Sequence, residues 1–192
     1  MLKILKFDTK ALYLSRMGKL YSKFERMADT WIIALDNYTI EELLRVPADG
    51  GWSMGQVYIH IATANKYFLG KNAEKCANGE DVIVDGKGKT NTGRLVFFLE
   101  NFPPVKVKMP KKETGGVEPI QPESKEQILR KLIENKEFFK SIEERVEAAP
   151  KNARKKYPIL GYLNAGEWYS IGTFHMRHHL RQKRKLDKFL GK

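Results

Sequence analysis

Cysteine is nearly absent from this sequence, since Cys76 is the single cysteine among 192 residues. One cysteine excludes an intrachain disulfide framework and any cysteine-rich zinc module, and it is most simply explained by a reducing interior. Long apolar runs are absent as well, because no segment approaches the roughly 20 apolar residues that a membrane-spanning helix needs. Residues 1–7 alternate lysine with apolar side chains and do not build the apolar stretch of a secretory signal. We therefore expect a cytoplasmic protein without a membrane segment.

The composition also excludes a disordered or fibrous chain. Hydrophobic residues make up 42% of the sequence and charged residues make up 30%. A chain of this length can bury roughly 70% of the surface that it exposes when unfolded, so it needs no disulfide or structural metal to fold. We expect residues 1–192 to form a single domain.

Acidic residues are outnumbered by basic residues, 23 against 35, which gives a formal net charge of +12. Much of this excess is spread along the chain as lysine alternating with glutamate, which is typical of a solvent-exposed helix face. The one dense basic cluster lies at the C-terminal end and consists of Arg177, Arg181, Lys183, Arg184, Lys185, Lys188 and Lys192. Basic residues in a last helical turn also complement the helix dipole, and no recognised nucleic-acid motif accompanies them. We do not expect a nucleic-acid partner.

Four long segments have the apolar spacing of helices that bury one face. Capping signals mark the starts of the last three, because Ser53 and Ser124 each open a capping box and Asn164 precedes a glutamate at the equivalent spacing. The predicted helices cover approximately residues 17–35, 53–78, 124–149 and 164–190.

The connections between these segments differ greatly in length. Residues 36–52 form a short crossing with one predicted helix over residues 40–46. Residues 79–123 form a long strap that is rich in glycine and proline, with one short helix over about residues 93–101. The segment 151–163 ends in Pro158-Ile159-Leu160-Gly161, which we expect to form a turn into the last helix. Four helices with a long crossover between the second and the third predict an all-α four-helix bundle.

Three of the four histidines are crowded into the fourth predicted helix, at His175, His178 and His179. His175 and His179 are four residues apart, so their rings stack on one helix face, as two metal ligands on a helix must. His60 interrupts the apolar stripe of the second helix and is therefore expected to face the interior. Three neutral imidazoles suit Zn²⁺, Ni²⁺ or Fe²⁺ and leave a position for water or substrate. The alternative is that these histidines are hydrogen-bonded core residues.

Several neighbours complete the candidate site. On a helical wheel Trp168 and Gln182 lie about 20° from His175. Gln182 would either hydrogen-bond a ligand ring or line the polar floor of the site. His178 lies about 60° to one side, and we expect it to support a ligand or to face solvent.

Pocket walls and proton-transfer groups are harder to identify. Tyr67 on the His60 face and Trp168 on the face of the paired histidines are candidate walls, although plain core packing is the simpler interpretation of both. Met176 occupies the position at which an H-E-x-x-H metalloprotease carries its general base. Nothing in the sequence around Cys76 activates its thiol, so a free structural cysteine is expected. The catalytic residues are therefore not identified.

The order of these motifs resembles that of the DinB/YfiT-like superfamily, in two blocks. The first block runs from Trp52-Ser53-Met54-Gly55-Gln56 to His60. The second runs from Pro158-x-x-Gly161-x-Leu163-Asn164-x-x-Glu167-Trp168 to His175-x-x-x-His179-x-x-Gln182. The sequence departs from the family pattern at His178, where arginine is frequent, and this leaves the ligand set intact.

The resemblance implies a four-helix bundle in which His60, His175 and His179 hold a divalent metal, and it implies a homodimer. Members of the family are described as metal-dependent hydrolases or as S-transferases that conjugate a low-molecular-weight thiol. We expect a small-molecule substrate and zinc as the metal, with nickel or iron as alternatives. Two other functions stay open: a non-catalytic metal-stabilised bundle that binds a small ligand or a partner, and a nucleic-acid binder that uses the basic C-terminal helix.

Overall fold

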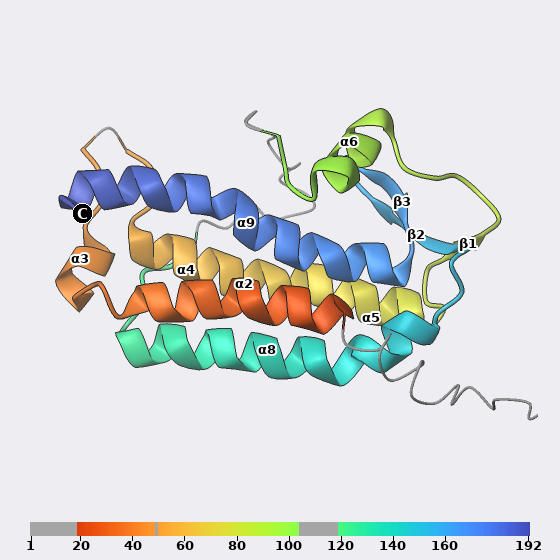
Figure 1. The fold of residues 1–192 in the computed structure, drawn as a ribbon, viewed down its shortest axis with the longest axis horizontal. Helices are drawn as coiled ribbons and strands as arrows, with labels where there is room; N and C mark the ends of the chain where they lie inside the picture. Colours follow the sequence, from red (N-terminus) through yellow and green to blue (C-terminus); the bar gives the residue numbers. More distant parts are fainter. Residues whose placement is uncertain (1–18, 49, 104–118) are drawn as a thin grey trace, which may run out of the picture.

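Helices form most of the structure, a computed structural model that describes residues 19–48, 50–103 and 119–192 (Figure 1). The helices are α2 (Lys19–Leu35), α3 (Ile40–Leu44), α4 (Met54–Thr63), the π-helix η1 (Ala64–Gly70), α5 (Lys71–Ala77), α6 (Asn91–Leu99), α8 (Lys125–Ala148) and α9 (Ala165–Leu190). The predicted helical class is thus confirmed. The expected first turn at Met17 and part of the expected strap, 104–118, lie outside the described residues.

Four long helical segments lie side by side in Figure 1: α2, the continuous run α4–η1–α5, α8 and α9. The segments α2 and α9 run in one direction, whereas α4–η1–α5 and α8 run in the other. The end of α5 and the start of α8 therefore lie at opposite ends of the molecule. No described helix is both long and apolar enough to cross a membrane.

Local capping explains where the long helices begin. Both Ser53 and Asn164 form complete capping boxes, as the sequence predicts, and each leaves the following helix with its first amides satisfied. At α8 half of the predicted box forms. The Ser124 hydroxyl accepts from the backbone amide of Gln127, but the Gln127 side chain accepts from the amide of Glu123 instead of Ser124.

The expected turn is present at residues 158–160, where it forms the tip of a β-hairpin whose two strands are not predicted from the sequence. Strand β2 (Ala153–Tyr157) pairs antiparallel with β3 (Gly161–Leu163), and β1 (Ile83–Val84) pairs with the other edge of β2. The sequence conceals β2 because its middle is a charged run without apolar alternation. Backbone contacts hold the hairpin in place instead, since the amide of Tyr162 donates to the carbonyl of Gly88 at 3.1 Å.

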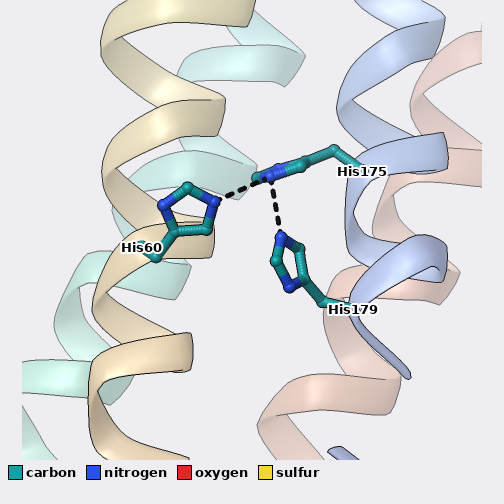
Figure 2. A group of neighbouring side chains, drawn as sticks. All are labelled: His60, His175 and His179. Atoms are coloured by element: carbon teal, nitrogen blue, oxygen red, sulfur yellow. Dashed lines mark hydrogen bonds between the residues drawn. The ribbon is translucent and has the colours of Figure 1, made fainter. Parts of the chain in front are cut away.

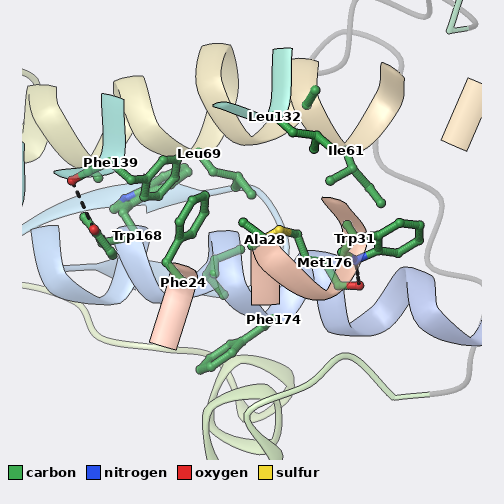
Figure 3. Close-up of a cluster of buried hydrophobic side chains, with 14 of the residues drawn as sticks. Phe24, Ala28, Trp31, Ile61, Leu69, Leu132, Phe139, Trp168, Phe174 and Met176 are labelled. Carbon is green, nitrogen blue, oxygen red and sulfur yellow. Dashed lines mark hydrogen bonds between the residues drawn. The ribbon is translucent and has the colours of Figure 1, made fainter. Parts of the chain in front are cut away.

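The apolar core lies between the four long segments (Figure 3). Phe24 of α2 stacks on Phe139 of α8 with 3.9 Å between ring centroids, and Tyr169 of α9 meets the same ring edge-on at 4.8 Å. The α8 stripe that the sequence predicts is buried throughout, at Ile128, Leu132, Phe139, Ile142 and Val146. One shared core therefore fixes the helices that carry the histidines.

Candidate metal centre

Three histidines meet between α4 and α9 (Figure 2). The Nε2 atom of His175 lies 3.1 Å from Nε2 of His60 and 3.1 Å from Nε2 of His179. One ring nitrogen from each histidine lies within 4.8 Å of the others. The structure thus brings together the three residues that the sequence predicts as ligands.

Trp31 of α2 ties together the two helices that carry these histidines. Its indole Nε1 donates to the carbonyl of Met176, the residue after His175, at 3.3 Å. Its own carbonyl accepts from the Tyr58 hydroxyl at 3.0 Å, two residues before His60. Trp31 and Tyr58 are fully buried, so these contacts fix the rotation of α4 and α9 about their axes.

Asn65, in the second position of η1, holds the outer nitrogen of His175. Its amide Nδ2 donates to the carbonyl of Gly172 at 3.3 Å, and its Oδ1 lies 2.8 Å from His175 Nδ1. Because a carbonyl can only accept, the amide nitrogen must face Gly172 and the amide oxygen must face the ring. His175 therefore carries its proton on Nδ1, and its Nε2 presents a lone pair to the other two histidines.

Gln182 holds His179 in the same way. The His179 Nδ1 atom donates to Gln182 Oε1 at 2.9 Å, one of the two roles that the sequence predicts for this glutamine. The Nε2 atoms of His175 and His179 then face each other with lone pairs at 3.1 Å, a separation that needs a cation or a shared proton between them. Nitrogen ligands around a tetrahedral zinc ion lie about 3.3 Å apart, so the two 3.1 Å separations are close to those around such an ion.

Burial keeps these rings neutral. Loss of solvent lowers the pKa of His175 well below its ordinary value, and the neighbouring His179 and His60 lower it further. Burial is also the main reason that the pKa of His179 falls to about 3, with a further contribution from His60. Neutral imidazole is the form that binds metals, so no proton has to leave either ring at neutral pH.

His178 lies beside the group without joining it. Its ring contacts the rings of Phe102 at 5.6 Å and His179 at 5.3 Å between centroids. Burial and the nearby Arg181 guanidinium lower its pKa. Its Nδ1 is buried without a hydrogen-bond partner in the described part of the chain. His178 therefore packs against a candidate ligand from one side.

The structure gives the surroundings of Tyr67 and Trp168, the two aromatic residues expected as pocket walls. Tyr67 is 61% exposed, because the wider turn of η1 rotates it away from the direction that an uninterrupted α-helix would give it. Trp168 is 1% exposed and packs against Phe68 and Tyr157, with its indole nitrogen donating to the carbonyl of Lys155. Core packing, the simpler interpretation, describes Trp168.

Two residues at the site have no predicted role. Trp52 packs against the His60 ring with 4.7 Å between centroids, and Asn65 holds His175. The signal for Asn65 was available, since a polar residue stands within the buried face of a helix. The family resemblance includes Trp52 as a helix-start residue and says nothing of this contact.

No carboxylate or thiol joins the three histidines within the described ranges. The Cys76 thiol is buried away from them, directed at the carbonyls of Ala153 and Leu163, and burial raises its pKa. This agrees with the expected structural cysteine. The described residues therefore offer a metal platform without an adjacent general base.

Comparison with known proteins places the sequence of this chain in a family. A family model described as the DinB superfamily matches residues 23–182, a range that includes the three histidines, Asn65 and Gln182. Searches of curated proteins and of solved structures found no match.

Proposed function

The chain belongs to the DinB superfamily, and from this premise we propose that it is a metal-dependent enzyme with a divalent ion held by His60, His175 and His179. The observation that carries the proposal is that Nε2 of His175 lies 3.1 Å from Nε2 of His60 and 3.1 Å from Nε2 of His179, with the lone pairs of His175 and His179 facing each other. Two facing lone pairs away from water are costly unless a metal cation or a shared proton lies between the nitrogens, and a metal ion would serve all three histidines at once.

Zinc is the metal that three neutral imidazoles favour most simply, with nickel and iron as alternatives. Three protein ligands leave a coordination position for water or substrate. A divalent ion in such a position lowers the pKa of a bound water or thiol to near neutral. The same ligands serve either chemistry, so we propose a hydrolase or a low-molecular-weight-thiol S-transferase with a small-molecule substrate.

The chain's own residues orient and shield the site. Asn65 and Gln182 fix the ring orientations of His175 and His179, and the indole of Trp52 covers one side of the His60 ring. The proposal includes a four-helix-bundle architecture with a long crossover. It also includes a homodimer, and sedimentation of the purified protein would detect that dimer.

Metal content tests the ligand set directly. Protein purified without a histidine tag or added metal should carry close to one equivalent of a transition metal per chain, measured by mass spectrometry of the elements. The variant His175→Ala should lose it. The matched control is His178→Ala, which removes a neighbouring histidine outside the group and should keep the metal. A wild-type protein that takes up neither Zn²⁺ nor Ni²⁺ would refute the proposal.

Activity tests the enzyme half of the proposal separately. Metal-loaded protein is screened for thiol conjugation and for hydrolysis of esters and amides, with chelated protein and His175→Ala as blanks. We expect turnover in one class that disappears in both blanks. Bound metal without turnover in any class would contradict the enzyme and favour a metal-stabilised binding module.

A further inference from the structure

We propose that Asn65 is a positioning residue of the metal centre, because its amide oxygen holds His175 in the ring form whose Nε2 can bind a metal. The predicted effect of Asn65 on metal affinity rests on the proposed function. The direct content of the proposal, the position of a proton on His175, is measurable in protein that holds no metal.

The contacts of Asn65 leave its side chain one orientation. The residue is 1% exposed, and its two amide atoms reach two points of α9 one turn apart, the carbonyl of Gly172 and the ring of His175. Exchanging the amide oxygen and nitrogen would set a donor against the ring and leave two acceptors facing each other at Gly172. The network therefore determines the direction of the hydrogen bond to His175.

A neutral histidine can carry its proton on either nitrogen, and the partner of one nitrogen decides the state of the other. Without an acceptor at Nδ1, the proton of His175 would move to Nε2 and be donated to His60 or His179, each 3.1 Å away. That internal hydrogen bond would use the atom that a metal needs. Asn65 prevents this shift, because its amide oxygen accepts the proton that His175 carries on Nδ1. Moving that proton to Nε2 would leave the amide oxygen without a donor.

The position of Asn65 also joins the two helices of the site. It follows His60 by five residues on the same helical run and lies in the π-helical segment η1, a feature found frequently at functional sites. The continuous segment α4–η1 thus supplies both a candidate ligand, His60, and the residue that orients His175 on α9, which is Asn65. Gln182 performs the orienting role for His179 from within α9 itself.

Three variants separate positioning from packing. Asn65→Leu removes both hydrogen bonds, whereas Asn65→Asp keeps an acceptor for His175 and loses the donor to Gly172. In metal-free protein, ¹⁵N NMR of the imidazoles should show His175 protonated at Nδ1 in wild type and in Asn65→Asp, and at Nε2 in Asn65→Leu. Competition with a zinc indicator should show affinity reduced about 10- to 100-fold in Asn65→Leu and within about 3-fold of wild type in Asn65→Asp.

The matched control is Asn135→Leu. Asn135 is also buried, and its amide donates to the carbonyl of Ala62 at 2.9 Å on the same helical run as Asn65. This variant should lower stability and leave both the His175 proton and the zinc affinity unchanged. The proposal is overturned if Asn65→Leu keeps the proton on Nδ1, or if Asn65→Asp loses it. It is also overturned if Asn135→Leu weakens zinc as much as Asn65→Leu does. A wild type that binds neither Zn²⁺ nor Ni²⁺ would refute the proposed function, while the NMR result would still decide the role of Asn65.

Discussion

At the scale of single residues, the site depends on which ring nitrogen holds a proton. His175 and His179 each donate from Nδ1 to a side-chain amide oxygen, and each turns Nε2 toward the histidine group. Burial prevents either ring from gaining a second proton near neutral pH. The two amides therefore preserve the ligand form of the rings by hydrogen bonding.

The same burial predicts how stability depends on pH. The pKa values of His175 and His179 are lower in the folded protein than the value of about 6.5 expected when unfolded, so the unfolded chain binds more protons below that pH. The stability that neutral histidines contribute is complete above pH 6.5 and is lost as the pH falls. We expect the free energy of unfolding of chelated protein to decrease by up to about 1.4 kcal/mol per pH unit for each ring.

Urea unfolding of chelated protein at pH 7.5, 6.5 and 5.5 measures this dependence. The pH range lies above the titration of carboxylates such as Glu74, whose pKa the Lys71 ammonium lowers, so histidines dominate it. The variant His179→Gln should show a shallower slope than wild type. An unchanged or increasing stability between pH 6.5 and 5.5 would contradict the prediction.

At the scale of elements, sequence patterns predicted the helices well and the exceptions have physical causes. Helix starts follow from local side-chain capping, so Ser53 and Asn164 were sufficient to place α4 and α9. The widened turn η1 and the hairpin β2–β3 have no such local signature. A π-helix changes the angle between successive residues without a recognisable sequence pattern. For this reason the sequence predicted the wrong direction for Tyr67, which is exposed. Backbone hydrogen bonds with Gly88 and Thr90 hold the hairpin in place. Gly88 precedes its partner Tyr162 by more than 70 residues, so no local pattern could indicate this contact.

The candidate ligands were predictable for a related reason. His175 and His179 share a face by helical spacing alone, and His60 stands out as a polar residue in an apolar stripe. Asn65 could not be assigned to His175 from the sequence, because that contact depends on the depth and rotation at which η1 meets α9. Spacing within one helix predicts which residues share a face, whereas contacts between helices require the packed structure.

The contact between α6 and the hairpin gives a prediction at this scale. A Cβ atom added at Gly93 would lie 2.2 Å from the carbonyl oxygen of Leu160, so backbone would have to move. We expect Gly93→Ala to lower the free energy of unfolding by about 1–3 kcal/mol, the usual cost of overpacking, despite the better helix propensity of alanine. Chemical denaturation provides the measurement.

The matched control is Gly166→Ala in the first turn of α9, where the nearest atoms to an added Cβ lie at 3.6 Å or beyond. That substitution should be neutral or should stabilise by up to about 1 kcal/mol. If Gly93→Ala stabilises the protein as Gly166→Ala does, α6 does not rest on the hairpin as the structure shows.

At the scale of the whole molecule, the positive charge is less concentrated than the sequence suggests. Within the basic C-terminal cluster, Arg177 lies 3.6 Å from a carboxylate oxygen of Glu100, Lys183 pairs with Asp187 at 2.9 Å, and Lys192 pairs with a carboxylate 3.0 Å away. Three members of the cluster thus form ion pairs with carboxylates of the same chain. This weakens the alternative that the cluster binds nucleic acid.

Phe139 links three of the four long segments, so we expect these segments to unfold together. It is fully buried, stacks on Phe24 of α2 and meets Tyr169 of α9. We expect Phe139→Ala to lower the free energy of unfolding by about 3–5 kcal/mol, with fluorescence and circular dichroism still reporting one coincident transition. The adjacent and partly exposed Phe138 is the control, and Phe138→Ala should cost less than half as much. Equal costs would show that the shared core does not centre on Phe139.

The long sequence separation within the site has a consequence for how the protein is made. His60 leaves the ribosome 115 residues before His175, and at about 5–20 residues per second this interval lasts roughly 6–23 s. During that time the nascent chain displays one imidazole of the three and lacks α9, which closes the core. If the three histidines hold a metal as proposed, its capture is a late event in the biogenesis of this protein, because it must follow translation of α9.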